Sequence, residues 1–282
     1  MKKQQLILVG GGLVLFVLLF FFGNTIPPKK ATPVAANTPH QEKVIETEKL
    51  LTHAKERLTP QQLEKVTSLE NSVKRGDVKN QQLQVYKTLS SFWRDTINLF
   101  EPYAYYLGQA AKLENSEKSL TFAAHLFLNN LKTEEEHAMQ DWLAKNAKDL
   151  FEQALKINPA NDSSKIGLGA CYIFGHISEN PMEGIAKIRE VVDRNPDNLF
   201  GQFILGLGGV RSGQFDKAIE RFLIVAEKQP DNLEAALNLA ETYDRKGDKI
   251  NAIKWYNTVK GKVSHPEAQK ELDARINALQ KN

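Results

Sequence analysis

Apolar side chains recur at intervals of three and four residues from about residue 44 to the end of the chain. This is the period of an amphipathic α-helix, and no stretch shows the strict apolar–polar alternation of a half-buried strand. The pattern therefore predicts an all-α fold. The first apolar stripe consists of Val44, Leu51 and Leu58, and a later one consists of Leu83, Tyr86, Leu89, Trp93 and Ile97.

A helix between these two stripes carries its own start signal. In Thr59-Pro60-Gln61-Gln62, Thr59 is the expected N-cap, Pro60 takes the first helical position, and Gln62 completes a capping box. Gly76-Asp77 ends this helix.

Residues 6–22 (LILVGGGLVLFVLLFFF) contain no charged side chain, and Lys2 and Lys3 precede them. As a helix the run is roughly 25 Å long, which is close to the thickness of a bilayer core. It is longer than the apolar part of a usual signal peptide, so residues 1–26 are predicted to be an uncleaved transmembrane signal anchor. Residues 27–40 contain four prolines and are predicted to be a linker. The short basic N-terminus favours a cytoplasmic tail and a soluble part outside the cytoplasm, which is the periplasm in a bacterium.

A repeat runs through the C-terminal half. NPDN at 195–198 returns as QPDN at 229–232, an interval of 34 residues, and a shift of 37 residues leads back to the preceding unit. The three extra residues fall in the turn HISENP at 176–181. A constant period of this length in helical sequence predicts stacked helix–turn–helix units.

The residues that recur within each unit resemble those of the tetratricopeptide repeat (TPR) family. In one unit they are Leu205-Gly206, Gly213-Gln214, Ala218, Phe222 and Pro230, and in the next Leu239-Ala240, Gly247-Asp248, Ala252 and Tyr256. The resemblance is specific over residues 142–266 and weak before them. It implies a TPR-type α-solenoid with about three clear repeats, degenerate N-terminal ones and a C-terminal cap helix. The expected divisions are 41–118 for the N-terminal helical region, 119–266 for the repeats and 267–282 for the cap.

The glycine-rich stretch LGLGGVRSG at 205–213 is not a nucleotide loop. A dinucleotide fingerprint would need glycine where Arg211 stands, and no strand precedes it. Gly206 is instead predicted at a helix–helix contact and Gly213 at a left-handed helix end. Gln202 and Gly209 stand where the family has large apolar residues, which predicts loose packing of that helix.

The remaining chemistry is sparse. Cys171 is the single cysteine and lies among apolar residues, so a buried small side chain is expected. The six histidines show no metal-ligand spacing, and the run TEEEHAMQD at 133–141 reads as a solvated helix start. A net charge of +3 without a dense basic block argues against a nucleic-acid surface. We therefore expect no cofactor, no metal and no enzyme activity.

The resemblance also implies where a partner binds. First-helix positions of tetratricopeptide repeats line a groove, and carried over to this chain they predict an apolar strip of Ile166, Phe174, Phe200, Phe203, Leu207, Val210 and Arg211. Such a strip suits a protein or peptide partner with an apolar or amphipathic segment. The alternative is that the chain fills its own groove with its N-terminal helices.

The expected function is therefore that of a membrane-anchored scaffold or adaptor for other proteins, resembling bacterial single-pass proteins of this family in envelope assembly or secretion. One alternative is an assembly factor that presents apo-proteins to an envelope enzyme. Another is a cytoplasm-facing receptor of the import type, which needs the opposite topology. The oligomeric state does not follow from the sequence.

Overall fold

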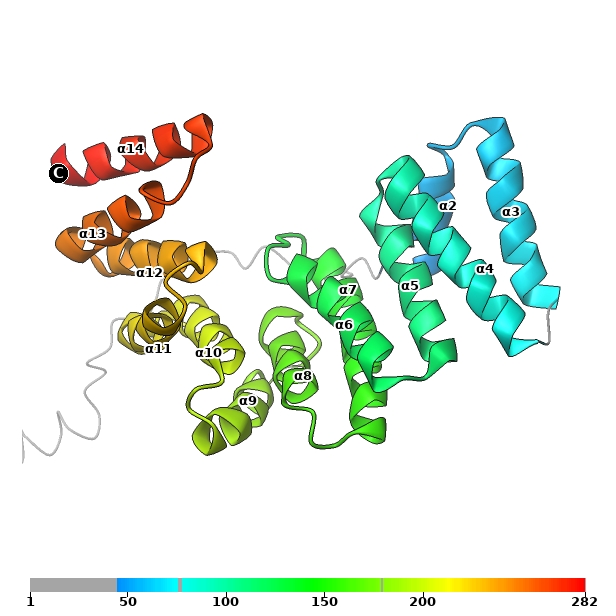
Figure 1. The fold of residues 1–282 in the computed structure, drawn as a ribbon, viewed down its shortest axis with the longest axis horizontal. Helices are drawn as coiled ribbons and strands as arrows, with labels where there is room; N and C mark the ends of the chain where they lie inside the picture. Colours follow the sequence, from blue (N-terminus) through cyan, green and yellow to red (C-terminus); the bar gives the residue numbers. More distant parts are fainter. Residues whose placement is uncertain (1–44, 76–77, 179, 282) are drawn as a thin grey trace, which may run out of the picture. The chain divides into compact units, whose positions relative to one another are not determined.

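The computed structural model describes residues 45–75, 78–178 and 180–281, and these form one compact unit. The described residues form helices and contain no strand, which confirms the all-α prediction (Figure 1). The helices are α2 (Thr47–Lys55), α3 (Pro60–Arg75), α4 (Lys79–Phe92), the π-helix η1 (Trp93–Ile97), α5 (Phe100–Glu114), α6 (Glu117–Leu131), α7 (His137–Ile157), α8 (Asp162–Phe174), α9 (Met182–Arg194), α10 (Leu199–Arg211), α11 (Phe215–Lys228), α12 (Leu233–Lys246), α13 (Lys249–Lys260) and α14 (Pro266–Lys281).

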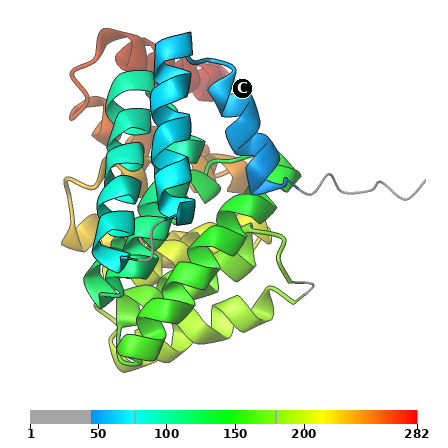
Figure 2. The same ribbon diagram turned by 90° about the vertical axis from the view of Figure 1, so that its right-hand side faces the viewer.

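From α4 onward the helices pack as successive hairpins. The pairs are α4/α5, α6/α7, α8/α9, α10/α11 and α12/α13, and α14 follows on the last pair. The first helices of neighbouring hairpins also contact each other, α6 with α8, α8 with α10, and α10 with α12. We call the surface formed by α6, α8, α10 and α12 the first-helix face. At the N-terminal end α3 and α4 run alongside each other (Figure 2).

The repeated Pro-x-Asn turn starts three first helices in the same way. The side chains of Asn161, Asn198 and Asn232 accept hydrogen bonds from the backbone N–H three residues later, at 2.8, 3.0 and 3.0 Å. An N-cap of this kind satisfies one of the donors that a helix start leaves free. The recurring motif is therefore a recurring helix start.

The capping box before α3 is present as predicted. The backbone N–H of Thr59 donates to the side chain of Gln62 over 2.9 Å, and that of Gln62 donates to the Thr59 hydroxyl over 3.3 Å. The helix predicted up to Ile97 differs, because α4 ends at Phe92 and η1 follows. Asn98 ends η1 in a left-handed conformation, and its N–H bonds to the carbonyl of Trp93.

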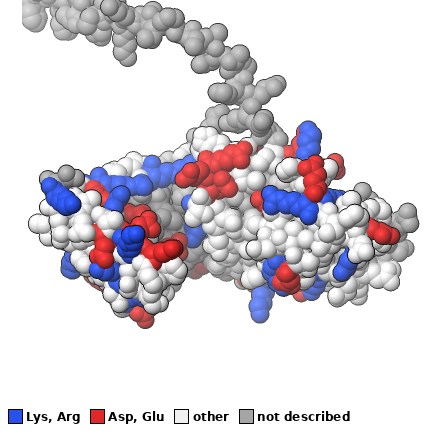
Figure 3. Space-filling view, turned by 90° about the horizontal axis from the view of Figure 1, so that it is seen from above, with Lys and Arg blue, Asp and Glu red and all other residues white. Residues whose placement is uncertain are grey.

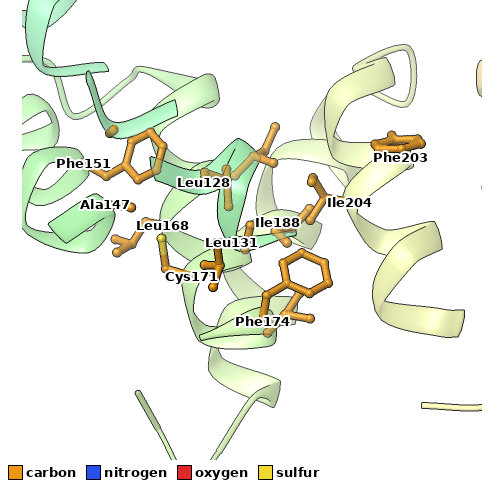
Figure 4. Packing of buried hydrophobic residues seen from close by; sticks show 14 of the residues in the cluster. Leu128, Leu131, Ala147, Phe151, Leu168, Cys171, Phe174, Ile188, Phe203 and Ile204 are labelled. Atoms are coloured by element: carbon orange, nitrogen blue, oxygen red, sulfur yellow. The ribbon is translucent and has the colours of Figure 1, made fainter. Parts of the chain in front are cut away.

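Three groups of buried side chains hold the helices together. The largest extends from α5 to α12 and includes Phe127 and Phe222. Figure 4 shows a part of this group that contains Phe151 and Ile188. A second group joins α12, α13 and α14. A third lies within α2 to α5 and surrounds Trp93, so the N-terminal helices have a core of their own.

Two predicted glycine roles are confirmed. Gly213 and the equivalent Gly247 have φ angles of +72° and +86°, the left-handed region that disfavours other residues. Gly206 lies against α11, where an added Cβ would come within 2.5 Å of the Phe222 ring.

We expect Gly206→Leu to destabilise the protein by about 1–3 kcal/mol through overpacking, because the Phe222 ring is fully buried and has little room to move. Urea unfolding followed by circular dichroism measures the change. Glu220→Leu, at an exposed position of the adjoining helix α11, is the control and should stay within about 0.5 kcal/mol. Equal stability of both variants would contradict the close contact.

The loose packing predicted around Gln202 and Gly209 is wrong. Gln202 is 1% exposed, its amide donates to the Pro196 carbonyl over 2.7 Å, and its oxygen accepts from Arg221 over 2.7 Å. A Cβ on Gly209 would lie 3.1 Å from that of Ala218, so α10 and α11 approach closely here. The buried Gln202 side chain has its hydrogen bonds satisfied, and the absence of a side chain at Gly209 lets the two helices come close. The contact is therefore tight without large apolar groups.

The predicted localisation needs correction. Among the residues that the structure describes, no helix combines the length and the apolar character needed to cross a bilayer. The expectation of a single-pass membrane protein with its soluble part outside the cytoplasm is therefore not supported by the structure. The run 6–22, on which that expectation rested, and the linker at 27–40 lie outside the described residues.

Candidate functional site

The predicted strip comes from two helices that contact each other, α8 and α10. Three of its side chains belong to the buried core, since Ile166, Phe174 and Phe203 are 0%, 5% and 7% exposed. In Figure 4 Phe174 and Ile204 lie in the group around Ile188 and Leu131, with Phe203 set apart from it. The half-buried and exposed members are Phe200, Leu207, Val210 and Arg211.

Helix α6 covers part of this strip. The imidazole of His125 packs edge-on against Phe200, with ring centroids 5.3 Å apart, and its Nε2 lies 2.7 Å from the Ser163 hydroxyl. Burial, and next the charge of Lys132, lower the pKa of His125 to about 4. The ring is therefore neutral at neutral pH and behaves as part of the packing.

Lys132, directly after α6, bridges two further helices. Its ammonium lies 5.5 Å from the centre of the Phe203 ring on α10 and 3.1 Å from a carboxylate oxygen of Glu234 on α12. The chain thus places its own side chains over α8 and α10. The contacts from α6 and Lys132 cover part of these two helices, whereas the self-filling considered from the sequence involved the helices nearer the N-terminus.

Helix α6 also carries an aromatic side chain that is exposed to solvent. Phe122 is 61% exposed and lies one turn before His125 in α6. The sequence did not single it out, because α6 is apolar on most of its surface and its period does not show which face stays uncovered. Phe122 is therefore an accessible ring on α6, one of the helices that form the first-helix face.

Arg211 marks the end of the strip. Its guanidinium donates to the carbonyl of Phe174 over 3.2 Å and lies 2.7 Å from Nε2 of His176. The His176 ring in turn packs at a tilt against that of His137, with ring centroids 4.5 Å apart. This cluster connects the long turn after α8 to the start of α7 and the end of α10, in keeping with the turn predicted to hold the insertion.

The surface is hollowed between α12, α13 and α14. A pocket of about 590 Å³ lies there, within the range of ligand pockets. We call it the cap pocket. Its lining is mostly apolar and consists of Leu237, Glu241, Tyr256, Val259, Val263, Ala268, Glu271, Leu272, Ala274, Arg275 and Ala278.

Ion pairs fix the cap helix beside this pocket. Arg275 Nε lies 3.0 Å from Asp244 on α12, and Lys260 on α13 lies 2.5 Å from Asp273. Charged side chains of both signs gather at this end of the chain (Figure 3). Leu237 and Glu241 lie on α12, the first helix of the last hairpin. The contribution of α14 was missed, because the sequence showed this helix only as a cap.

A second, more polar pocket of about 350 Å³ lies among α2 to α5. Lys55 and Glu70 form an ion pair of 2.5 Å within it, and the Tyr106 hydroxyl bonds to the same carboxylate. Burial and the bond to Glu70 raise the pKa of Tyr106. These contacts join α2, α3 and α5 and give the pocket a structural role.

No reactive centre stands out among the described residues. Their histidine, cysteine, aspartate and glutamate side chains include no group of three or more placed to hold a metal ion. Cys171 is fully buried, as the sequence predicted, and burial raises the pKa of its thiol. A buried, protonated thiol is a poor nucleophile.

Comparison with known proteins identifies the repeat. A tetratricopeptide repeat family model matches residues 205–265, which run from α10 through α13. No curated protein matches the chain.

Solved structures with similar helix arrangements are distant in sequence. A MamA structure from Desulfovibrio magneticus RS-1 is 21% identical, with 66% of this chain and 96% of that chain covered and a TM-score of 0.42. YrrB, titled a TPR protein with an unusual peptide-binding site, is 18% identical, with 73% and 97% covered and a TM-score of 0.42. PilW, titled a widely conserved type IV pilus biogenesis factor, is 17% identical, with 70% and 93% covered and a TM-score of 0.48.

Proposed function

Since residues 205–265 place the chain in the tetratricopeptide repeat family, we propose that it is a scaffold or adaptor that holds a protein partner on its first-helix face. Proteins of this family mediate protein–protein interactions, and stacked repeats present extended surfaces for this purpose. The contact residues in this proposal are Phe122, Phe200, Leu207 and Val210, with Arg211 at their edge. The division into 41–118, 119–266 and 267–282 is part of the same proposal.

The exposure of apolar side chains on this face carries the proposal. Phe122 is 61% exposed, and Phe200, Leu207 and Val210 are half-buried against the core while Arg211 is exposed. Exposed aromatic groups on a rigid surface are common anchors of a protein interface. The buried members of the predicted strip, Ile166, Phe174 and Phe203, support this surface from beneath.

The double substitution Phe122→Ser and Phe200→Ser tests the proposal. We expect crosslinking and affinity capture from cell extract to lose the specific partner, since each anchoring ring contributes about 2 kcal/mol to such contacts. Circular dichroism should stay native, because neither ring is fully buried. The matched control is Ile250→Ser on α13, which removes a side chain 83% exposed outside the first-helix face.

Retained capture by the folded double variant would contradict the proposed surface. Loss of capture in the Ile250→Ser control instead would place the interface on α13. Phe203→Ser is a separate control for stability: its ring is 7% exposed and packs 5.6 Å from that of Phe222, so this variant should unfold more readily.

A role in envelope assembly or secretion remains a prediction from the resemblance. The pilus biogenesis role is that of PilW, which is 17% identical to this chain.

A further inference from the structure

The cap pocket has an apolar floor between the last hairpin and α14. Tyr256 and Val259 of α13 are buried at 2% and 3% exposure, and Leu272 of α14 is 9% exposed. Ala268 and Ala278 line the pocket on α14, and their small side chains leave its volume open. Such a floor favours the burial of apolar side chains from another molecule.

The rim of the pocket is acidic. Glu241 on α12 and Glu271 on α14 both line it, and neither forms an ion pair or side-chain hydrogen bond with the part of the chain that the structure describes. Arg275, the basic residue in the lining, is already paired with Asp244 at 3.0 Å. A cation entering beside the apolar floor would therefore meet two carboxylates without competition from a local partner.

We propose that the cap pocket binds an amphipathic segment of a protein partner in which a lysine or arginine flanks the apolar side chains. The apolar side chains fill the floor, and the cation pairs with Glu241 and Glu271. This inference rests on the proposed function as a protein-binding scaffold and names the chemistry of the bound segment. An acidic segment would place carboxylates against Glu241 and Glu271, and repulsion would exclude it.

Two synthetic helical peptides test this chemistry on the full chain. Both carry the same leucines on one face; lysines flank the leucines in one peptide, and glutamates replace them in the other. We expect fluorescence anisotropy to show saturable binding of the lysine peptide, weakened by added salt, and no binding of the glutamate peptide.

Variants locate the binding. Glu241→Gln with Glu271→Gln should weaken binding of the lysine peptide about fivefold, as expected for two partly exposed ion pairs. Glu183→Gln with Glu220→Gln removes the same charge from exposed positions on α9 and α11 and should change nothing. Ala278→Phe should fill the pocket from an exposed position and weaken binding about tenfold or more.

Three results would overturn the inference: equal binding of both peptides, no binding of either, or binding unaffected by the pocket variants. Dimerisation of the chain that Ala278→Phe abolishes would make a second copy the occupant, and would also overturn it. The proposed function is tested separately by partner capture. If capture still depends on Phe122 and Phe200, the proposed function stands even when the cap pocket fails these tests.

Discussion

Gly184→Leu is expected to destabilise the protein by about 3 kcal/mol or more, the largest effect of a single substitution that we predict. Helices α8 and α9 meet at Gly169 and Gly184. A Cβ on Gly169 would lie 2.6 Å from the carbonyl oxygen of Gly184, and a Cβ on Gly184 would overlap the carbonyl oxygen of Gly169. Backbone atoms cannot change rotamer, so the helices themselves must separate. This distinguishes Gly184 from Gly206, where the obstacle is a side chain.

Thermal unfolding measures this effect, and the midpoint should fall by about 6–12 °C. Hydrogen exchange should place the loss of protection in α8 and α9. The matched control is Ala186→Leu, which adds the same side chain to an exposed position of α9 and should stay within about 0.5 kcal/mol. An unchanged midpoint for Gly184→Leu would contradict the backbone contact between the two helices.

Acidification is expected to weaken the fold through His125. The pKa of His125 is lowered to about 4 in the folded protein, by burial first and then by Lys132, whereas its ordinary value is 6.5. Above pH 6.5 the ring is neutral in both states and contributes no pH dependence. As the pH falls from 6.5 to about 4, the unfolded chain takes up the proton and the folded chain does not. Stability is therefore lost in this window, by at most about 3 kcal/mol, and less in proportion to the water that reaches the ring.

His125→Gln separates this effect from the titration of carboxylates. Urea unfolding of both proteins between about pH 7 and about pH 4 should show a smaller loss of stability in the variant. Glutamine retains a hydrogen-bonding group for Ser163 but carries no titratable site. Parallel pH profiles of the two proteins, or a His125 ring that is protonated at pH 6 in NMR spectra, would contradict the lowered pKa.

The sequence was sufficient for features that depend on neighbouring residues. The Asn198 cap reaches only to Gly201, and the capping box joins Thr59 to Gln62, so both follow from a few adjacent residues. The 34-residue interval repeats such helix starts, and a repeated start implies a repeated hairpin. The close contact at Gly206 was also predicted, because the repeat pattern has a small residue at this position, but its neighbour Phe222 was identified by the structure.

Only the tertiary structure decided which apolar faces stay open. The bridge from Lys132 to Glu234 joins residues 102 positions apart, and the contact of His125 with Phe200 joins α6 to α10. These contacts cover part of the predicted strip and leave Phe122 exposed. In the same way, α14 completes the cap pocket with Glu271 and Arg275. An amphipathic period shows that a helix has an apolar side, but what covers that side depends on how distant helices pack, and this is set by the balance of burial over the whole stack.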